Sequence, residues 1–168
     1  MQEVTTKQEL EERYKLVSFL LGDEWYAEDI GCIQEVNRLQ EITELPGLPE
    51  YILGVINLRG KIIPIMDLKK RLGMQQTEPD EKSRILVVSH RGSMIGVLVD
   101  SVHQVIELSS SMVSEPPATV ASNRYIRGIG RVDDRLIFIL DLRAIFDDSE
   151  LSSGEEEISG YGNDKSKG

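Results

Sequence analysis

The sequence predicts an all-β protein built from two small barrels in tandem, and three observations support this prediction. The chain repeats itself, because residues 51–68 and 125–142 match without a gap. In most segments, apolar residues alternate with polar ones or form short runs between glycine-containing turns, which is the pattern of strands. Helix signals are confined to two brief segments. Five or so short strands with one short helix per unit are typical of a small barrel.

The repeat relates YILGVINLRGKIIPIMDL (51–68) to YIRGIGRVDDRLIFILDL (125–142) at a constant offset of 74. Seven pairs are identical: Tyr51/Tyr125, Ile52/Ile126, Gly54/Gly128, Ile63/Ile137, Ile65/Ile139, Asp67/Asp141 and Leu68/Leu142. Upstream, Ile30, Ile33 and Val36 match Val99, Val102 and Val105 at an offset of 69. A unit of roughly 60 to 70 residues is only marginally stable alone. We therefore expect the two units, residues 14–80 and 81–146, to pack as one body.

Each unit is expected to begin with a strand, a tight turn and a second strand. These strands are Val17–Leu21 and Trp25–Ile30 around Gly22-Asp23, and Ile85–Val88 and Met94–Val99 around Arg91-Gly92. Residues 34–36 and 104–106 follow as further strand segments.

A hairpin is expected next, with strands 55–58 and 61–66 joined at Arg59-Gly60, where glycine supplies the positive φ of a tight turn. Pro64 lacks an N–H group, so we expect its strand to lie at a sheet edge or to be bulged at that residue.

The two helix signals follow the hairpins. Asp67 is a good N-cap, residues 69–71 are basic and Gly73 suits the position after the helix, which predicts a short helix over 68–72. Asp141 and residues 142–146 repeat the pattern.

Charge divides the chain into a body and two fringes. The net charge is −10, and 40% of the residues are hydrophobic. Asp147 to Gly168 carries seven acids and two bases and is rich in Ser and Gly, which predicts a disordered acidic tail. Residues 1–13 are expected to form an N-terminal arm. The body between them is nearly balanced, with a net charge of −3 from 18 acids and 15 bases.

This charge argues against the classes of protein that bind phosphate-rich surfaces. An acidic chain opposes binding to nucleic acid and to anionic membranes. The longest apolar run, Met94–Val99, is far shorter than the ~18 residues that span a bilayer, and the polar N-terminus lacks the features of a secretory signal. The sequence thus predicts a soluble, cytoplasmic protein.

No catalytic, cofactor or metal site is expected. The two histidines, His90 and His103, have no ligand at metal-binding spacing, and Cys32 is the single cysteine. Asp67 and Asp141 occupy capping positions. Two alternatives remain open: a hydrolase that uses Asp67, Asp100 or Asp141, and a barrel that binds nucleic acid.

The two units differ most at the hairpin tip, which is Asn57-Leu58-Arg59-Gly60-Lys61 in the first and Arg131-Val132-Asp133-Asp134-Arg135 in the second. An exposed Leu58 beside Arg59 would combine an apolar contact with a rigid set of donors, so this tip is a candidate protein-binding site. The segment Ile33–Val36 is expected to border a groove between the barrels.

At these residues the chain closely resembles the CheW coupling proteins of bacterial chemotaxis. The resemblance covers about Tyr14 to Phe146, and it rests on GVINLRGKIIPIMDLKKRLG, on Ile33-Gln34-Glu35-Val36 and on Gly96–Val102. It implies two intertwined five-stranded SH3-like barrels with short helices, with the exchange of a strand between them allowed. It also implies an adaptor without enzymatic activity.

The resemblance further implies two partners: the cytoplasmic tips of chemoreceptors and the regulatory domain of the histidine kinase CheA. Receptor binding would use Ile33, Glu35, Val36 and Arg59. Kinase binding would use Asn57, Leu58, Arg59, Gly60 and Lys61, and the second barrel with its connector Ser114 to Val120 would offer a second kinase contact. An adaptor of a type IV pilus or another chemosensory pathway is the alternative.

Overall fold

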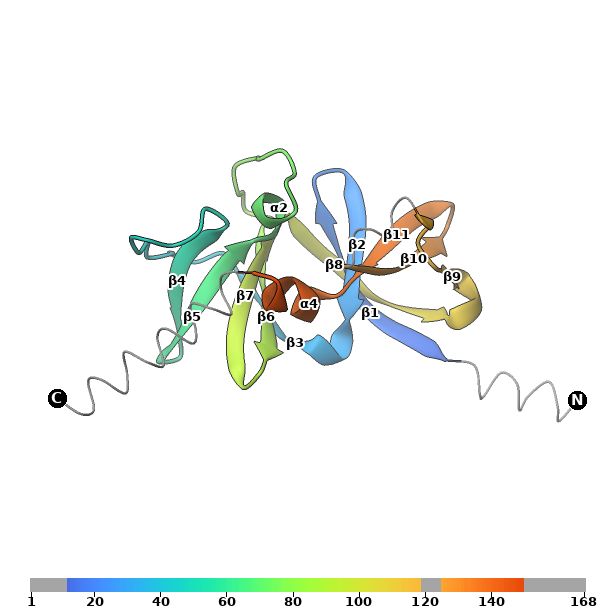
Figure 1. The fold of residues 1–168 in the computed structure, drawn as a ribbon, viewed down its shortest axis with the longest axis horizontal. Coiled ribbons are helices and arrows are strands. Elements are labelled where there is room, and N and C mark those ends of the chain that lie inside the picture. Colours follow the sequence, from blue (N-terminus) through green and yellow to red (C-terminus); the bar gives the residue numbers. More distant parts are fainter. Residues whose placement is uncertain (1–11, 119–124, 150–168) are drawn as a thin grey trace, which may run out of the picture.

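The computed structural model describes residues 12–118 and 125–149, and most of these residues lie in two sheets (Figure 1). The six-stranded sheet contains, in spatial order, β8 (Ser101–Ser109), β1 (Arg13–Leu21), β2 (Glu24–Asp29), β11 (Arg135–Leu140), β10 (Ile126–Val132) and β9 (Val113–Ser114). The five-stranded sheet contains β3 (Ile33–Arg38), β6 (Arg84–His90), β7 (Ser93–Val99), β5 (Lys61–Asp67) and β4 (Ile52–Leu58). The predicted all-β fold is confirmed. One sheet has six strands because the two-residue β9 adds to its edge.

The helices are short: η1 (Ile30–Cys32), α2 (Leu68–Arg71), η2 (Ser110–Met112) and α4 (Leu142–Asp147). The two predicted N-caps are confirmed, because the Asp67 side chain accepts a hydrogen bond from the Lys70 N–H and the Asp141 side chain accepts one from the Ala144 N–H. Each cap satisfies a helix N–H that has no partner within the helix.

The two sheets exchange hairpins between the repeats. The β1–β2 hairpin of the first repeat pairs antiparallel with β8 and parallel with β11. The β6–β7 hairpin of the second repeat pairs antiparallel with β3 and parallel with β5. The sheets therefore do not follow a division near residue 80: one takes residues 33–99, and the other takes residues 13–29 together with 101–140.

Three apolar clusters result from this arrangement. One lies inside each sheet: Ile56, Ile63, Ile65, Ile85, Val87 and Leu98 in the five-stranded sheet, and Leu16, Ala27, Leu108, Ile137 and Ile139 in the six-stranded sheet. The largest joins the two sheets and includes Phe19, Leu21, Met66, Leu68, Leu86, Val88, Leu140, Leu142, Ile145 and Phe146. Figure 1 shows α2 and α4 between the sheets, where they contribute to this third cluster.

Arg71 of α2 ties the two repeats together. Its guanidinium lies over the rings of Tyr51 and Tyr125, 5.4 and 5.2 Å from the centroids, and these tyrosines are equivalent residues of the repeat. It also donates a hydrogen bond to the Tyr125 hydroxyl (2.9 Å). Cation–π contacts of this kind are most favourable when they are shielded from water.

The prediction for Pro64 is wrong, because β5 lies inside its sheet and the bulge in the β4–β5 pair falls opposite, between Ile52 and Gly54. Pro64 faces Val55, whose N–H and C=O both bond to Thr43 instead. Pairing with β7 begins one residue later, at Ile65. No ladder bond therefore requires an N–H from Pro64 at this point.

The expected arm (residues 1–13) and tail (residues 147–168) lie largely outside the described residues, which begin at residue 12 and end at residue 149. The folded body extends beyond the predicted boundary at both ends, since β1 begins at Arg13 and α4 runs to Asp147. Ser149 is buried and its hydroxyl donates to the Phe146 carbonyl. Within the described residues, no helix is both long and apolar enough to cross a membrane.

Candidate functional site

The edge strand β3 presents different side chains on its two faces. A bulge lies between Ile33, which pairs with Val88, and Glu35, which pairs with Val87. Val88 belongs to the cluster between the sheets, whereas Val87 belongs to the interior of the five-stranded sheet. Because Val36 pairs with the next residue, Leu86, of the cluster between the sheets, Ile33 and Val36 share one face and Glu35 lies on the other.

The apolar face of β3 reaches solvent. Ile33 is half-buried against the cluster between the sheets, while Val36 is 40% exposed. Since β3 is at the edge of its sheet, Val36 continues the apolar surface of that cluster outward. Such a rim can be covered by an apolar side chain of another protein.

Glu35 pairs with Arg59, which brings the edge strand β3 to the tip of the β4–β5 hairpin. The Arg59 guanidinium donates to one carboxylate oxygen of Glu35, and the Asn37 side-chain amide donates to the other (2.7 Å). Both hydrogen bonds lower the pKa of Glu35 below its ordinary value, and the bond from Arg59 has the larger effect. The same bond to Glu35 raises the pKa of Arg59. β3 and β4 are the two edges of the sheet, so this pair bridges its open side.

The hairpin tip is a tight turn held by its own residues. Arg59 and Gly60 both have positive φ, 51° and 84°, and the Asn57 side chain accepts from the Gly60 N–H (2.9 Å). Arg59 and Lys61 are exposed. The expectation of an exposed Leu58 is corrected here, because Leu58 is half-buried and packs against the interior cluster of its sheet.

The structure thus brings Glu35 and Arg59 together, with Asn57 and Gly60 shaping the turn beside them. Ile33 and Val36 form a neighbouring surface on the opposite face of β3. Two residues of this region are not indicated by the motifs in the sequence: Asn37, which orients Glu35, and Ile62, which is 65% exposed beside the tip. Strand alternation was the available signal for Ile62, since Ile63 and Ile65 both face the interior.

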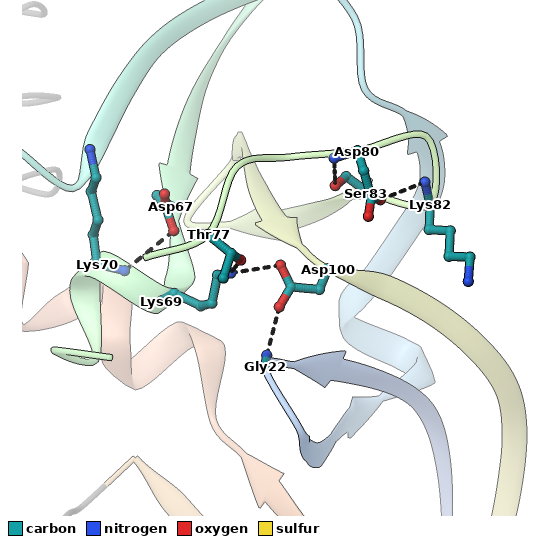
Figure 2. Close-up of polar contacts among 9 residues, drawn as sticks. All are labelled: Gly22, Asp67, Lys69, Lys70, Thr77, Asp80, Lys82, Ser83 and Asp100. Carbon is teal, nitrogen blue, oxygen red and sulfur yellow. Dashed lines mark hydrogen bonds and ion pairs between the residues drawn. The ribbon is translucent and has the colours of Figure 1, made fainter. Parts of the chain in front are cut away.

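The three aspartates considered for hydrolysis have structural partners. Asp67 and Asp141 cap helices, and Figure 2 shows that Asp100 lies between Lys69 of α2 and the β1–β2 turn. One Asp100 oxygen is 2.9 Å from Lys69 Nζ, and the other accepts from the Gly22 N–H (2.6 Å). No group of three or more potential metal ligands occurs in residues 12–118 and 125–149.

Glu28 is a buried acid close to the start of α4. Its two carboxylate oxygens accept from the Asp29 and Leu142 N–H groups, both at 2.7 Å, and Arg127 is 3.9 Å away. The effect of burial is larger than the opposing effect of these contacts, which lower the pKa of Glu28, and the pKa is raised to about 7. Burial likewise raises the pKa of the Cys32 thiol to about 11, so this thiol is protonated at neutral pH.

Comparison with known proteins identifies similar chains. The family model for the CheW-like domain matches residues 15–150. A probable chemotaxis protein CheW of Rhizobium etli is 33% identical over 138 residues, which are 81% of this chain and 89% of that protein. The protein PilI of Pseudomonas aeruginosa is 31% identical over 125 residues, 73% of this chain and 70% of that protein. The crystal structure of the scaffolding protein TtCheW from Thermoanaerobacter tengcongensis superimposes with a TM-score of 0.75 at 40% identity, covering 80% of this chain and 93% of that one.

Proposed function

The chain belongs to the CheW family of chemotaxis adaptors, and on this premise we propose that it couples chemoreceptors to the histidine kinase CheA without catalysing a reaction itself. The proposal assigns it to the cytoplasm, where receptor tips and kinase meet. The observation that carries it is the pairing of Glu35 with Arg59, which joins two chemically different surfaces at one edge of the molecule.

The first surface, proposed for the receptor, is the outer face of β3. Receptor tips are helical, and a helix can place apolar side chains against Ile33 and the exposed Val36. Glu35 and Arg59 lie at the border of this surface, where their charges select a partner of matching polarity.

The second surface, proposed for the kinase, is the β4–β5 tip from Asn57 to Lys61. Arg59 and Lys61 are exposed cations, and Ile62 adds an exposed apolar side chain that we now include in this surface. Leu58 supports the turn by packing against the apolar cluster inside the five-stranded sheet. The turn is rigid because Asn57 bonds to Gly60, so little ordering entropy is lost on binding. A second kinase contact on the other barrel, near the connector from Ser114, is part of the proposal; Val120 lies outside the described residues.

Reconstitution tests this function directly. Receptor cytoplasmic fragments, the kinase and this chain are combined, and kinase autophosphorylation is followed with and without receptor ligand. We expect ligand control of the kinase only when the chain is present. Kinase activity that responds equally well without the chain would contradict the proposal.

An adaptor of a pilus-related pathway is the second candidate, because PilI is similar over most of this chain. Purification of the chain from its host under mild conditions, followed by identification of the retained kinase and receptors, separates the two pathways.

A further inference from the structure

A pocket of about 550 Å³ opens in the six-stranded sheet, between β8 and the tip of the β10–β11 hairpin. Its lining residues are Ser18, Trp25, Val102, His103, Gln104, Ile106, Val132, Asp133, Arg135 and Ile137. Trp25, Ile106, Val132 and Ile137 contribute to the apolar cluster inside the sheet. The pocket is therefore the outer end of that interior, with apolar walls and a polar rim.

Two rim residues are held in place by Trp25. The Arg135 guanidinium lies 4.6 Å from the indole centroid, and the His103 ring meets the indole edge-on at 4.5 Å. Gln104 and Asp133 also line the pocket. Within the described residues, their side chains make no hydrogen bond or ion pair. An acid and an amide thus face the pocket with their hydrogen-bonding capacity unused.

The repeat shows what this position holds in the other sheet. Asp133 is equivalent to Arg59 at an offset of 74, and both begin a tight turn with almost the same φ, 49° and 51°. Gln104 is equivalent to Glu35 at an offset of 69, and both lie on an edge strand. In the five-stranded sheet, the guanidinium of Arg59 binds the carboxylate of Glu35 at these two positions. In the six-stranded sheet the guanidinium is missing, and an acid occupies its place.

We infer that this pocket binds an arginine side chain presented by another protein. The guanidinium pairs with the Asp133 carboxylate and the Gln104 side-chain carbonyl, and the aliphatic stem lies against Val132 and Ile106. Arginine fits better than lysine because its planar set of donors can reach two acceptors at once. Two charges face the pocket, the Asp133 carboxylate and the Arg135 guanidinium, so the test below also includes an acidic ligand.

This site differs from the receptor surface on β3 and from the kinase surface at the β4–β5 tip, and its test requires neither partner. Trp25 is the single tryptophan of the chain, so its fluorescence and its indole N–H resonance both report on the pocket. The probe is N-acetyl-arginine amide, titrated into the full chain. N-acetyl-citrulline amide, which has the same shape but no charge, is the matched ligand.

We expect saturable shifts of the Trp25 indole and Gln104 amide resonances with a Kd of about 1 to 10 mM for the arginine compound, as suits a ligand of this size. Citrulline is expected to bind roughly tenfold more weakly, because it lacks the charge. Asp133→Asn is expected to reduce arginine affinity by about tenfold, whereas Asp134→Asn, its neighbour in the same turn, leaves it unchanged. Both variants should fold, because asparagine tolerates positive φ.

Three results would overturn the inference. The first is the absence of resonance shifts at arginine concentrations about tenfold above the expected Kd. The second is equal binding of arginine and citrulline, or of Asp133→Asn and the unaltered chain. The third is a stronger response to N-acetyl-aspartate amide or inorganic phosphate, which would show that Arg135 makes the pocket a site for anions.

Discussion

Lys69 Nζ lies 2.9 Å from the Asp100 carboxylate, and Asp100 is the one residue between β7 of the five-stranded sheet and β8 of the six-stranded sheet. Lys69 is 5% exposed and its ammonium group also donates to the Thr77 hydroxyl (Figure 2). The second Asp100 oxygen bonds to the Gly22 N–H. One partly buried ion pair therefore fixes the point where the chain crosses between its sheets.

Breaking this pair from one side should be costly. We expect Lys69→Met to lower the free energy of unfolding by about 3 kcal/mol, because Asp100 is left with a partly buried and uncompensated charge. Lys70→Met, on the neighbouring residue whose side chain has no such partner in Figure 2, should change it by less than about 0.5 kcal/mol. Urea denaturation followed by circular dichroism measures both values. Equal stabilities for the two variants would show that the ion pair contributes nothing.

Glu28 should make stability depend on pH. Burial raises its pKa from an ordinary 4.5 to about 7, so the folded chain holds this proton more tightly than the unfolded chain does. The contribution of Glu28 to stability is then greatest below pH 4.5, falls as the pH rises, and levels off above about pH 7, with a total loss of about 3 kcal/mol. Denaturant unfolding at several pH values from 5 to 8 measures this slope.

Glu28→Gln should remove that part of the slope, while Glu24→Gln, exposed on the same strand, should retain it. The Glu28 variant also loses an acceptor for one backbone N–H group and is therefore expected to be less stable at low pH. A pH profile identical to that of the unaltered chain would show that Glu28 does not titrate in this range.

Arg59→Asp should weaken binding to the kinase regulatory domain and to receptor fragments by at least about tenfold, because it places two carboxylates together at the tip and removes an exposed cation. The fold should persist, since Arg59 is exposed and aspartate tolerates positive φ. Pull-down and titration measure binding, with circular dichroism as the check on folding. The charge-matched control is Arg131→Asp, which changes an exposed arginine on β10. If the Arg59 variant binds as well as this control does, Arg59 is not part of the site.

Val36→Asp should weaken receptor binding by about tenfold and leave kinase binding within about twofold of normal, because Val36 lies on the outer face of β3, away from the Glu35 side. Val105→Asp is the matched control, since Val105 is the equivalent residue of the other edge strand and is 50% exposed. Titration of receptor fragments separates the two variants. Equal losses in both would indicate a general effect of charge on an edge strand.

Local patterns in the sequence predicted much of the fold. The hairpin around Arg59-Gly60 and the caps at Asp67 and Asp141 depend on residues close together in the chain, and the structure contains each of them. The exchange of hairpins was not predictable in the same way. The β1 strand has the alternation of any half-buried strand, and nothing in it distinguishes β8, more than 70 residues away, as its partner.

The candidate site shows the same division. Sequence reasoning selected Glu35 and Arg59, but their contact depends on the approach of two sheet edges, which is a property of the closed sheet. Leu58 was expected to be exposed because it adjoins a turn; strand alternation instead directs it inward, toward Ile56 and Ile63. The pocket beside Trp25 is lined by residues of β1, β2, β8, β10 and β11, so no single segment of the sequence indicates it.

The hairpin exchange also constrains how the protein is made. While the ribosome synthesises the first 80 residues, β1 and β2 have no complete sheet to join, because β8, β10 and β11 do not yet exist. The five-stranded sheet closes first, when β6 and β7 emerge, and the opening hairpin must wait until nearly the whole chain is translated. Until then its apolar residues Phe19 and Leu21 can pack only against the five-stranded sheet, through cluster residues such as Leu86 and Val88.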